Sequence, residues 1–85
     1  MHPSYVERVI VPDAGYASGL LVGVPNGRVY STGVNELEVY INGWRQNPDT
    51  NLVSWDNDFQ EFATTGVKIH YALASGSLVL FQVNY

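Results

Sequence analysis

The stretch Leu37-Glu38-Val39-Tyr40-Ile41-Asn42-Gly43-Trp44-Arg45-Gln46 decides the fold of this chain. Apolar and polar residues alternate in it up to Ile41, and the pair Asn42-Gly43 then stands where a strand must reverse. Asn and Gly both tolerate the positive φ angles that a type I′ turn requires. The stretch therefore predicts a β-hairpin whose turn is Asn42-Gly43.

The alternation in this stretch also predicts which side chains point inward. Leu37, Val39 and Ile41 are expected to face a hydrophobic core, because alternate residues of a strand share one face. Glu38 and Tyr40 are expected to face the other way. A slip of one residue would exchange the two faces, so the register of this strand is well specified.

The rest of the chain consists of short runs of strand-forming residues between turn residues, and no helix is evident. The predicted strands are residues 5–11, 19–24, 28–31, 37–41, 44–46, 52–55, 67–73 and 78–85. Residues 59–64 are either a further strand or one short helical turn, because Phe59, Phe62 and Ala63 have helical spacing. We predict one domain, residues 1–85, that is all-β: a small antiparallel β-sandwich of about 6–8 short strands, with residues 1–4 as an N-terminal arm.

The composition suggests that part of the surface is covered by a partner. A chain of 85 residues buries only about 60% of its unfolded surface, and this one has no cysteine with which to add a disulfide. Only 14% of its residues are charged, against roughly 25% in an average domain, while 46% are hydrophobic. We expect a homo-oligomer or a docked component; a monomer with a surface rich in Ser, Thr and Asn is the alternative.

The charges argue against several partners. The net charge is −4, and the four cations, Arg8, Arg28, Arg45 and Lys68, are scattered along the chain. No basic stripe is present to follow a phosphate backbone, so nucleic acid is not an expected partner. The longest apolar run, residues 20–24, is too short to span a membrane, and residues 1–4 lack the features of a signal peptide. We expect a soluble protein that is synthesised in the cytoplasm.

The last predicted strand is apolar on both faces. One face consists of Val79, Phe81, Val83 and Tyr85, and the opposite face begins with Leu78 and Leu80. A strand that is apolar on both faces is buried on both. A neighbouring subunit is one cover for the second face, and an arm or long loop of the same chain is the other.

The first strand shows the same pattern. Val6 and Ile10 share one face, and Val9 and Val11 share the other. The residues that we assign to the partner-facing sides of the two strands are Val9, Val11, Leu78 and Leu80.

The sequence contains little that suggests catalysis or metal binding. His70 lies on the polar face of a predicted strand, where an exposed histidine is the ordinary expectation, and no Gly-x-Ser-x-Gly elbow is present. Asp56, Asn57, Asp58 and Glu61 resemble a set of calcium ligands, but the spacing of a calcium loop is not met. We therefore predict no catalytic residue, no metal site and no cofactor.

Aromatic side chains suggest a further kind of function, the binding of sugars. Tyr40 is predicted to point outward and Trp44 directly follows the turn, so either ring is a candidate for stacking on a sugar. Tyr30 and Trp55 are further candidates for stacking on a sugar. Aromatic residues of small β domains more often fill a core or a subunit interface, which is the alternative for all four.

Residues 35–46 also resemble a segment of bacteriophage tail-fibre and other virion-surface proteins. Its usual form is Leu-x-Val-Tyr-hydrophobic-Asn-Gly, then a residue pair and often Gln, and Leu37 to Gln46 follow it. The resemblance extends loosely over residues 24–85: a polar loop, a weak strand, a strand rich in Val and Ile, a small Gly turn and a final alternating strand. It differs at Gly76-Ser77, where the family usually has Gly-Asp.

The resemblance implies an all-β sandwich that is often trimeric and has a structural role without catalysis. The family's domain is normally one module of a long fibre, whereas a free-standing module of this size is expected to dock on a larger structure. The leading hypothesis is a capsid decoration (cement) protein on the virion surface, with itself and the major capsid protein or other virion proteins as partners. A tail or tail-fibre component, such as an adaptor or receptor-binding tip, is the second hypothesis, and a glycan-binding module is the third.

Overall fold

The predicted hairpin lies at one edge of a four-stranded sheet. In a computed structural model of the chain, which describes residues 4–33, 36–49 and 57–83, seven strands form two antiparallel sheets. In spatial order the larger sheet contains β1 (Tyr5–Ile10), β7 (Leu78–Val83), β3 (Leu37–Ile41) and β4 (Trp44–Arg45). The smaller sheet contains β2 (Leu21–Gly23), β6 (Gly66–Ile69) and β5 (Phe59–Ala63).

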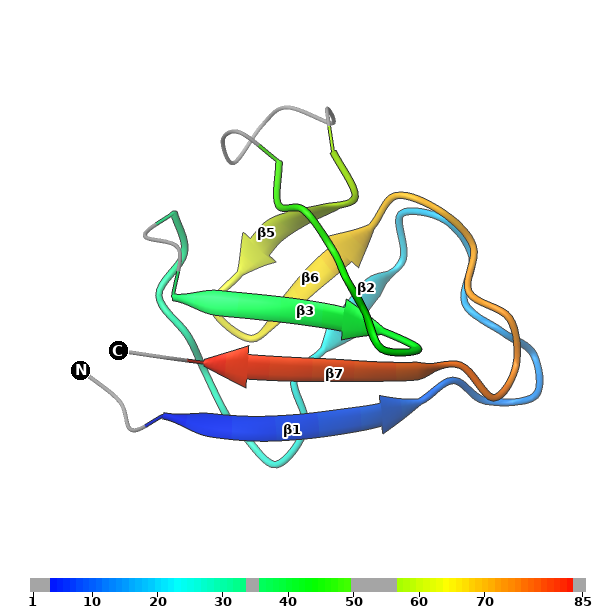
Figure 1. Cartoon of the computed structure of the whole chain (residues 1–85), viewed down its shortest axis with the longest axis horizontal. Helices are drawn as coiled ribbons and strands as arrows, with labels where there is room; N and C mark the ends of the chain where they lie inside the picture. The colour runs from blue at the N-terminus through cyan, green and yellow to red at the C-terminus, as the bar shows by residue number, and fades with distance from the viewer. Residues whose placement is uncertain (1–3, 34–35, 50–56, 84–85) are drawn as a thin grey trace.

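The two sheets pack as the layers of a small all-β sandwich, as predicted from the sequence. The strands of the smaller sheet run obliquely to those of the larger sheet (Figure 1). The hydrophobic core draws buried residues from both sheets, among them Val39, Phe59, Val67, Val79 and Phe81. The described residues contain no helix that is long and apolar enough to cross a membrane.

The larger sheet has the alternation that the sequence predicted for its central strands. In β3, Leu37, Val39 and Ile41 are buried, and in β7 every second residue from Val79 to Val83 is buried. Val39 pairs with Phe81 in the β3–β7 ladder, so the inward faces of the two strands coincide. Period-2 patterning was sufficient to orient these strands because each has a purely apolar inner face.

Three predicted segments differ in the structure. Residues 28–31 do not form a strand; instead Tyr30 is fully buried there, and its hydroxyl donates a hydrogen bond to the Gly66 carbonyl at 2.9 Å. Burial raises the pKa of Tyr30 above its ordinary value. Residues 59–63 form β5, so the strand alternative for the 59–64 segment is correct and the helical turn is not, and the predicted strand 67–73 ends at Ile69. The predicted strand 52–55 and residues 1–3 of the predicted arm lie outside the described residues.

Two glycines set the spacing of the smaller sheet. Gly23 of β2 and Gly66 of β6 are paired in its antiparallel ladder. A Cβ atom on Gly66 would lie 2.7 Å from the Val22 carbonyl oxygen, whereas one on Gly23 would meet only the Thr65 oxygen, at 3.8 Å. The close backbone approach of β2 and β6 therefore requires a residue without a side chain at position 66.

Candidate interaction face

The larger sheet presents one face to the core and the other to solvent, and we call the second the outer face. The ladder registers place the outward side chains of its strands in three rows. The rows are Val6–Gln82–Glu38, Arg8–Leu80–Tyr40–Arg45 and Ile10–Leu78. All of these side chains are exposed or half-buried, so the outer face is accessible in the isolated chain.

The β1 part of the outer face corrects the sequence prediction. Val11 is only 2% exposed and belongs to the core, and Val9 packs against that core. The predicted partner-facing role of Val9 and Val11 is therefore wrong, because both point toward the smaller sheet. The apolar residues that β1 does expose are Val6 (46%) and Ile10 (63%).

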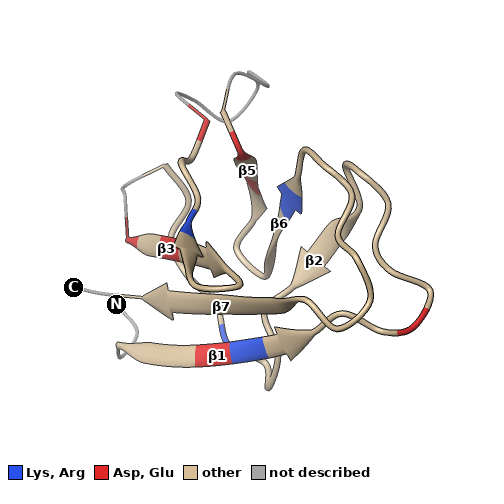
Figure 2. Cartoon of the chain, turned by 45° about the vertical axis from the view of Figure 1, so that its right-hand side comes forward, with Lys and Arg blue, Asp and Glu red and all other residues tan. Residues whose placement is uncertain are grey.

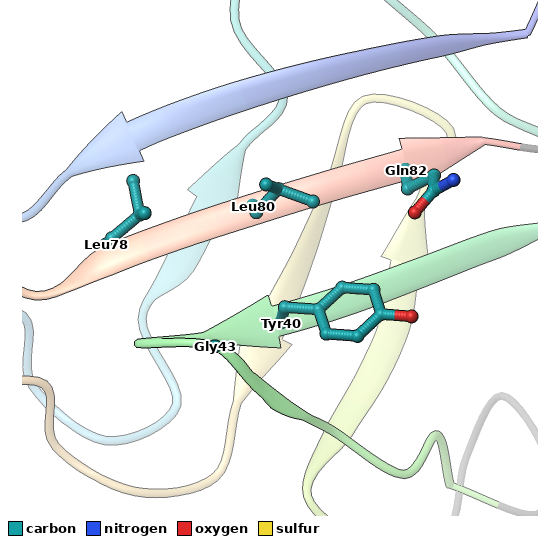
Figure 3. Close-up of a pocket in the computed structure, with 5 residues that line it drawn as sticks. All are labelled: Tyr40, Gly43, Leu78, Leu80 and Gln82. Atoms are coloured by element: carbon teal, nitrogen blue, oxygen red, sulfur yellow. The ribbon is translucent and has the colours of Figure 1, made fainter.

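A groove runs over the middle of the outer face. It has a volume of about 270 Å³ and is lined by Tyr40, Gly43, Leu78, Leu80 and Gln82. Figure 3 shows the Leu78 and Leu80 side chains standing on β7, with the Tyr40 ring on the neighbouring strand β3. Leu80 and Tyr40 are directly paired in the ladder, so this pair forms the floor of the groove. Leu78 and Leu80, which the sequence assigned to the partner-facing side, do point away from the core.

One side of the groove carries polar groups. The Tyr40 hydroxyl donates to Glu38 Oε1 at 3.2 Å, and the same oxygen lies 3.8 Å from Arg45 Nε. These contacts fix the outer end of the Tyr40 side chain while its ring stays in the groove. The result is an apolar floor beside charged groups, which is the usual organisation of a protein interface.

The hairpin turn closes one end of the groove. Asn42 and Gly43 have φ angles of 51° and 85°, as a type I′ turn requires. The Asn42 N–H donates to the Leu78 carbonyl, and Asn42 Oδ1 accepts from the Leu78 N–H, both at 2.9 Å. The turn is thus joined to the start of β7 and not only to its own hairpin.

The two candidate aromatic contacts lie on different faces of the sheet. Tyr40 pairs with Arg45 on the outer face, whereas Trp44 pairs with Ile41, whose side chain is buried in the core. Trp44 escapes the core because β4 is a short edge strand, and it is 77% exposed. Tyr40 and Trp44 therefore do not combine into one stacking platform. Tyr30, the other described aromatic residue considered for sugars, is buried.

Gln46, which ends the quoted stretch, ties the hairpin to a distant segment. Its backbone N–H donates to the Val39 carbonyl at 2.8 Å, and its side-chain nitrogen donates to the Trp44 carbonyl at 3.0 Å. Its side-chain oxygen accepts a hydrogen bond from the Tyr71 hydroxyl. Gln46 is buried, so these bonds compensate for the loss of water at its amide.

A buried contact between a histidine and an aspartate was not expected from the sequence. His70 Nε2 lies 2.6 Å from Asp49 Oδ2, and the two side chains are only 10% and 1% exposed. The expectation of a surface histidine at position 70 is therefore wrong. The Asn57 N–H donates to Asp49 Oδ1 at 2.9 Å, and Asp58 Oδ2 accepts from the Asn47 N–H at 2.8 Å. These contacts join residues 47–49 and 57–58, which precede β5 in the sequence, to each other and to His70, which follows β6. The two aspartates therefore have a structural role.

Glu61 is a second buried acidic residue. Its carboxylate accepts a hydrogen bond from the Gly33 N–H at 2.7 Å. Burial raises the pKa of Glu61 above its ordinary value, and the Glu36 carboxylate adds to the effect, while the Gly33 hydrogen bond opposes it. Asp58 and Glu61, two members of the calcium-like set, thus serve separate backbone groups. Among the residues that the structure describes, no three His, Asp or Glu side chains are grouped so as to hold a metal ion.

The charged residues of β1 do not identify its exposed face. Arg8 lies between Val6 and Ile10 at the period of a strand, but Glu7 lies in the same way between Tyr5 and Val9 on the opposite face. Each face therefore carries one charged residue, and neither is marked as the side away from the core. The Asp49–His70 pair also has no signal in the sequence, because its members come from separate segments.

Comparison with family models, with curated proteins and with solved structures gave no significant match for this chain.

Proposed function

We propose that this chain is a non-enzymatic structural protein of a bacteriophage virion, a small decoration protein that docks on the capsid surface and stabilises it. The observation that carries the proposal is the apolar outer face, with its groove over Tyr40, Leu78 and Leu80. The likeness of residues 35–46 to virion-surface proteins supplies the setting. Residues 37–45 of that segment build β3, the turn and β4, and Tyr40 and Gly43 among them line the groove.

Docking on a larger structure would cover a substantial part of the surface of this chain. A standard interface covers about 800 Å² of each partner, which is about a sixth of the 4844 Å² surface of this chain. Burying apolar surface contributes roughly 25 cal/mol per Å², before the entropy cost of association. Many copies on one shell multiply a modest contribution from each. A face rich in Leu, Val and Ile can therefore stabilise a capsid without any catalytic group.

The polar contacts beside the groove give the docked chain an orientation. Glu38 is held by Tyr40 and Arg45 at one side, and Arg8 lies in the same row as Leu80. Complementary charges on a partner would favour one alignment over others, which is the main contribution of charged groups at an interface. Sister subunits can use the same face, and the resemblance favours a trimer.

The position of this protein in the virus particle tests the proposal. Purified virions of the phage that encodes the chain would be labelled with gold-conjugated antibodies against this protein and imaged. Labels spread over the shell support a decoration protein. Labels confined to the tail would replace it with the second candidate, a tail or tail-fibre component, and an unlabelled particle that also lacks the protein by mass spectrometry would overturn both.

A glycan-binding module remains the candidate from another class, and the 77% exposure of Trp44 favours it. Because Tyr40 and Trp44 lie on different faces, one of them must act alone. Titration with a panel of oligosaccharides while following tryptophan fluorescence tests this function. A saturable change that Trp44→Ala abolishes and Tyr40→Phe keeps would support sugar stacking on Trp44. A flat response would count against a glycan site at Trp44.

A further inference from the structure

The outer edge of β1 is the longest free strand edge in the described part of the chain. β1 is an edge strand of the larger sheet, its one neighbour there is β7, and it is six residues long. The edge strands β4 and β2 contain only two and three residues, and β5 contacts Pro48 through an isolated bridge. Long free edges invite pairing with another chain, and native proteins usually shorten or cover them.

The hydrogen-bond pattern shows which residues of β1 face this edge. The Val11 N–H donates to the Ser77 carbonyl, and the Val11 carbonyl accepts from the Gly76 N–H, both at 2.9 Å. In an antiparallel ladder the residues that bond to a given neighbour recur every second position. The backbone groups of Tyr5, Glu7 and Val9 therefore face β7. Those of Val6, Arg8 and Ile10 face the free edge.

The same three residues have their side chains on the outer face. A strand added at the edge would therefore pair its backbone with Val6, Arg8 and Ile10 and place its own side chains beside theirs. Val6 and Ile10 are exposed apolar residues, and Arg8 is an exposed cation between them. Figure 2 shows a positive segment of β1 directly beside a negative one. The negative residue, Glu7, precedes Arg8 in the strand, so the two side chains lie on opposite faces.

Glu7 is already engaged on the inner side of β1. Its carboxylate accepts hydrogen bonds from Asn26 Nδ2 at 2.8 Å and from Arg28 Nε at 3.1 Å. The Tyr5 hydroxyl donates to the Val29 carbonyl at 2.8 Å. The partners of Glu7 and Tyr5 lie in the loop that follows β2. In Figure 1 this loop emerges beyond β1 on the side of its free edge. The loop gives an added strand a surface to lie against, with Val29 exposed on it.

Arg8 decides what kind of strand fits. In the pairing of two β1 strands that overlaps best, Arg8 of one copy would stand opposite Arg8 of the other, and like charges in that position are destabilising. A shift by two residues leaves Arg8 opposite Val6 or Ile10, which again gives the guanidinium no acid. Among the described residues Arg8 has no ion-pair partner of its own. The edge is therefore better suited to an acidic partner than to a second copy of this chain.

We propose that the free edge of β1 binds an extended segment of another protein as an added antiparallel strand. The segment carries an acidic residue opposite Arg8 and apolar residues opposite Val6 and Ile10. Backbone hydrogen bonds supply the common part of the affinity, and the three side-chain pairs supply the selectivity, as in other cases of strand addition. Val6, Arg8 and Ile10 share the outer face with the groove over Leu78 and Leu80 but do not line it. Pairing at the β1 edge therefore does not depend on the proposed docking of that groove.

Two peptides of defined sequence test the proposal. The first is acetyl-Thr-Val-Thr-Glu-Thr-Val-Thr-amide, and the second has Lys in place of Glu. Each is titrated into the isotope-labelled full chain while the amide signals are followed by NMR. We expect the glutamate peptide to shift the amides of Val6, Arg8 and Ile10 and to slow their hydrogen exchange. We expect it to bind roughly fivefold more tightly than the lysine peptide, as the energies of cross-strand charge pairs imply.

Two variants make the test specific. Arg8→Glu should reverse the preference between the peptides. Val6→Pro should abolish binding, because proline removes an N–H that faces the edge while it leaves the ladder with β7 intact, and circular dichroism checks that the variant folds. The proposal is overturned if neither peptide binds at millimolar concentration, if both bind equally, or if the shifts appear at Gly43 in the groove. Self-association of the chain through β1 without peptide would also overturn it.

Discussion

Asn42 and Leu78 are joined by two hydrogen bonds, one in each direction. The Asn42 N–H donates to the Leu78 carbonyl, and the Leu78 N–H donates to Asn42 Oδ1, both at 2.9 Å. The residue that makes the hairpin turn possible therefore also fixes the start of β7 next to it. Since Gly43 and Leu78 both line the groove, the shape of the candidate interaction face depends on this one side chain.

Two substitutions at Asn42 separate its role in the turn from its side-chain hydrogen bond to Leu78. Asn42→Ala loses the side-chain acceptor and places an alanine at a φ of 51°, so we expect a loss of about 1–3 kcal/mol in the free energy of unfolding. Asn42→Gly tolerates the positive φ and loses only the hydrogen bond, so about 0.5–1 kcal/mol is expected. Urea denaturation of the three proteins measures both values. Equal losses in the two variants would contradict the dual role.

Gly66 and Gly23 offer a matched pair within one ladder. Gly66→Ala is expected to destabilise the fold by about 1–3 kcal/mol, because the new Cβ would lie 2.7 Å from the Val22 carbonyl oxygen and β2 would have to move. Gly23→Ala meets nothing closer than 3.8 Å and should be neutral or slightly stabilising. Thermal unfolding followed by circular dichroism compares the two. The close approach of β2 and β6 is refuted if the two variants have the same melting temperature.

Leu80 is the test residue for the outer face. Leu80→Asp places a charge on the floor of the groove, so we expect weaker assembly or capsid binding with little change in folding, since the side chain is not in the core. Leu21→Asp is the control, because Leu21 is an exposed leucine on a strand of the other sheet. Native mass spectrometry and circular dichroism are measured for both variants. A folded Leu80→Asp protein with unchanged oligomer mass and unchanged capsid binding would remove the outer face from consideration.

Glu61 is expected to destabilise the fold at neutral pH. Its pKa in the folded chain is raised by burial, so the charged form carries a penalty that is present at pH 7 and is relieved as the pH falls through the folded pKa. Glu61→Gln keeps an oxygen that can accept the Gly33 hydrogen bond and removes the charge. The variant should therefore melt at a higher temperature than the parent protein at pH 7, and the difference should shrink toward pH 4.

Glu7 has the opposite pH dependence and serves as the comparison. Hydrogen bonds from Asn26 and Arg28 hold the pKa of Glu7 below its usual range, so its contribution is present at neutral pH and is lost as the pH falls through that lowered pKa. Glu7→Gln should melt at a lower temperature than the parent protein at neutral pH, and the difference should shrink as the pH is lowered through the pKa of Glu7. If Glu61→Gln showed that same trend, the raised pKa of Glu61 would be contradicted.

The strands that could be predicted are those whose two faces differ clearly. β3 and β7 alternate without interruption, and the positive φ of Asn42 and Gly43 follows from their residue types. β5 was ambiguous because its residues are buried on both faces, Gln60 and Glu61 included, and its register with β6 shifts between Gln60 and Ala63. A strand with an irregular ladder does not show a period of 2 in its sequence.

The remaining differences come from contacts between distant segments. Residues 28–31 read as a strand, yet the chain there is fixed by Tyr30, whose hydroxyl bonds to Gly66 and whose N–H bonds to the Thr64 carbonyl. His70 was expected at the surface because it lies on the polar face of a predicted strand. Its partner Asp49 lies 21 residues earlier, so the sequence does not reveal the contact. The outer face was predicted correctly at Leu78 and Leu80 but wrongly at Val9 and Val11. Apolarity alone does not say which side of β1 meets the second sheet.

The central position of β7 has a consequence for the order of events during synthesis. β7 is made after all the other described strands, yet it lies between β1 and β3 and supplies the only ladder that joins them. β1 and β3 therefore emerge from the ribosome with unsatisfied edges and exposed apolar faces until Leu78–Val83 follow. Such long-range pairing is slow and leaves the nascent chain open to misassembly. The larger sheet therefore cannot be completed before Leu78–Val83 are available to pair with both β1 and β3.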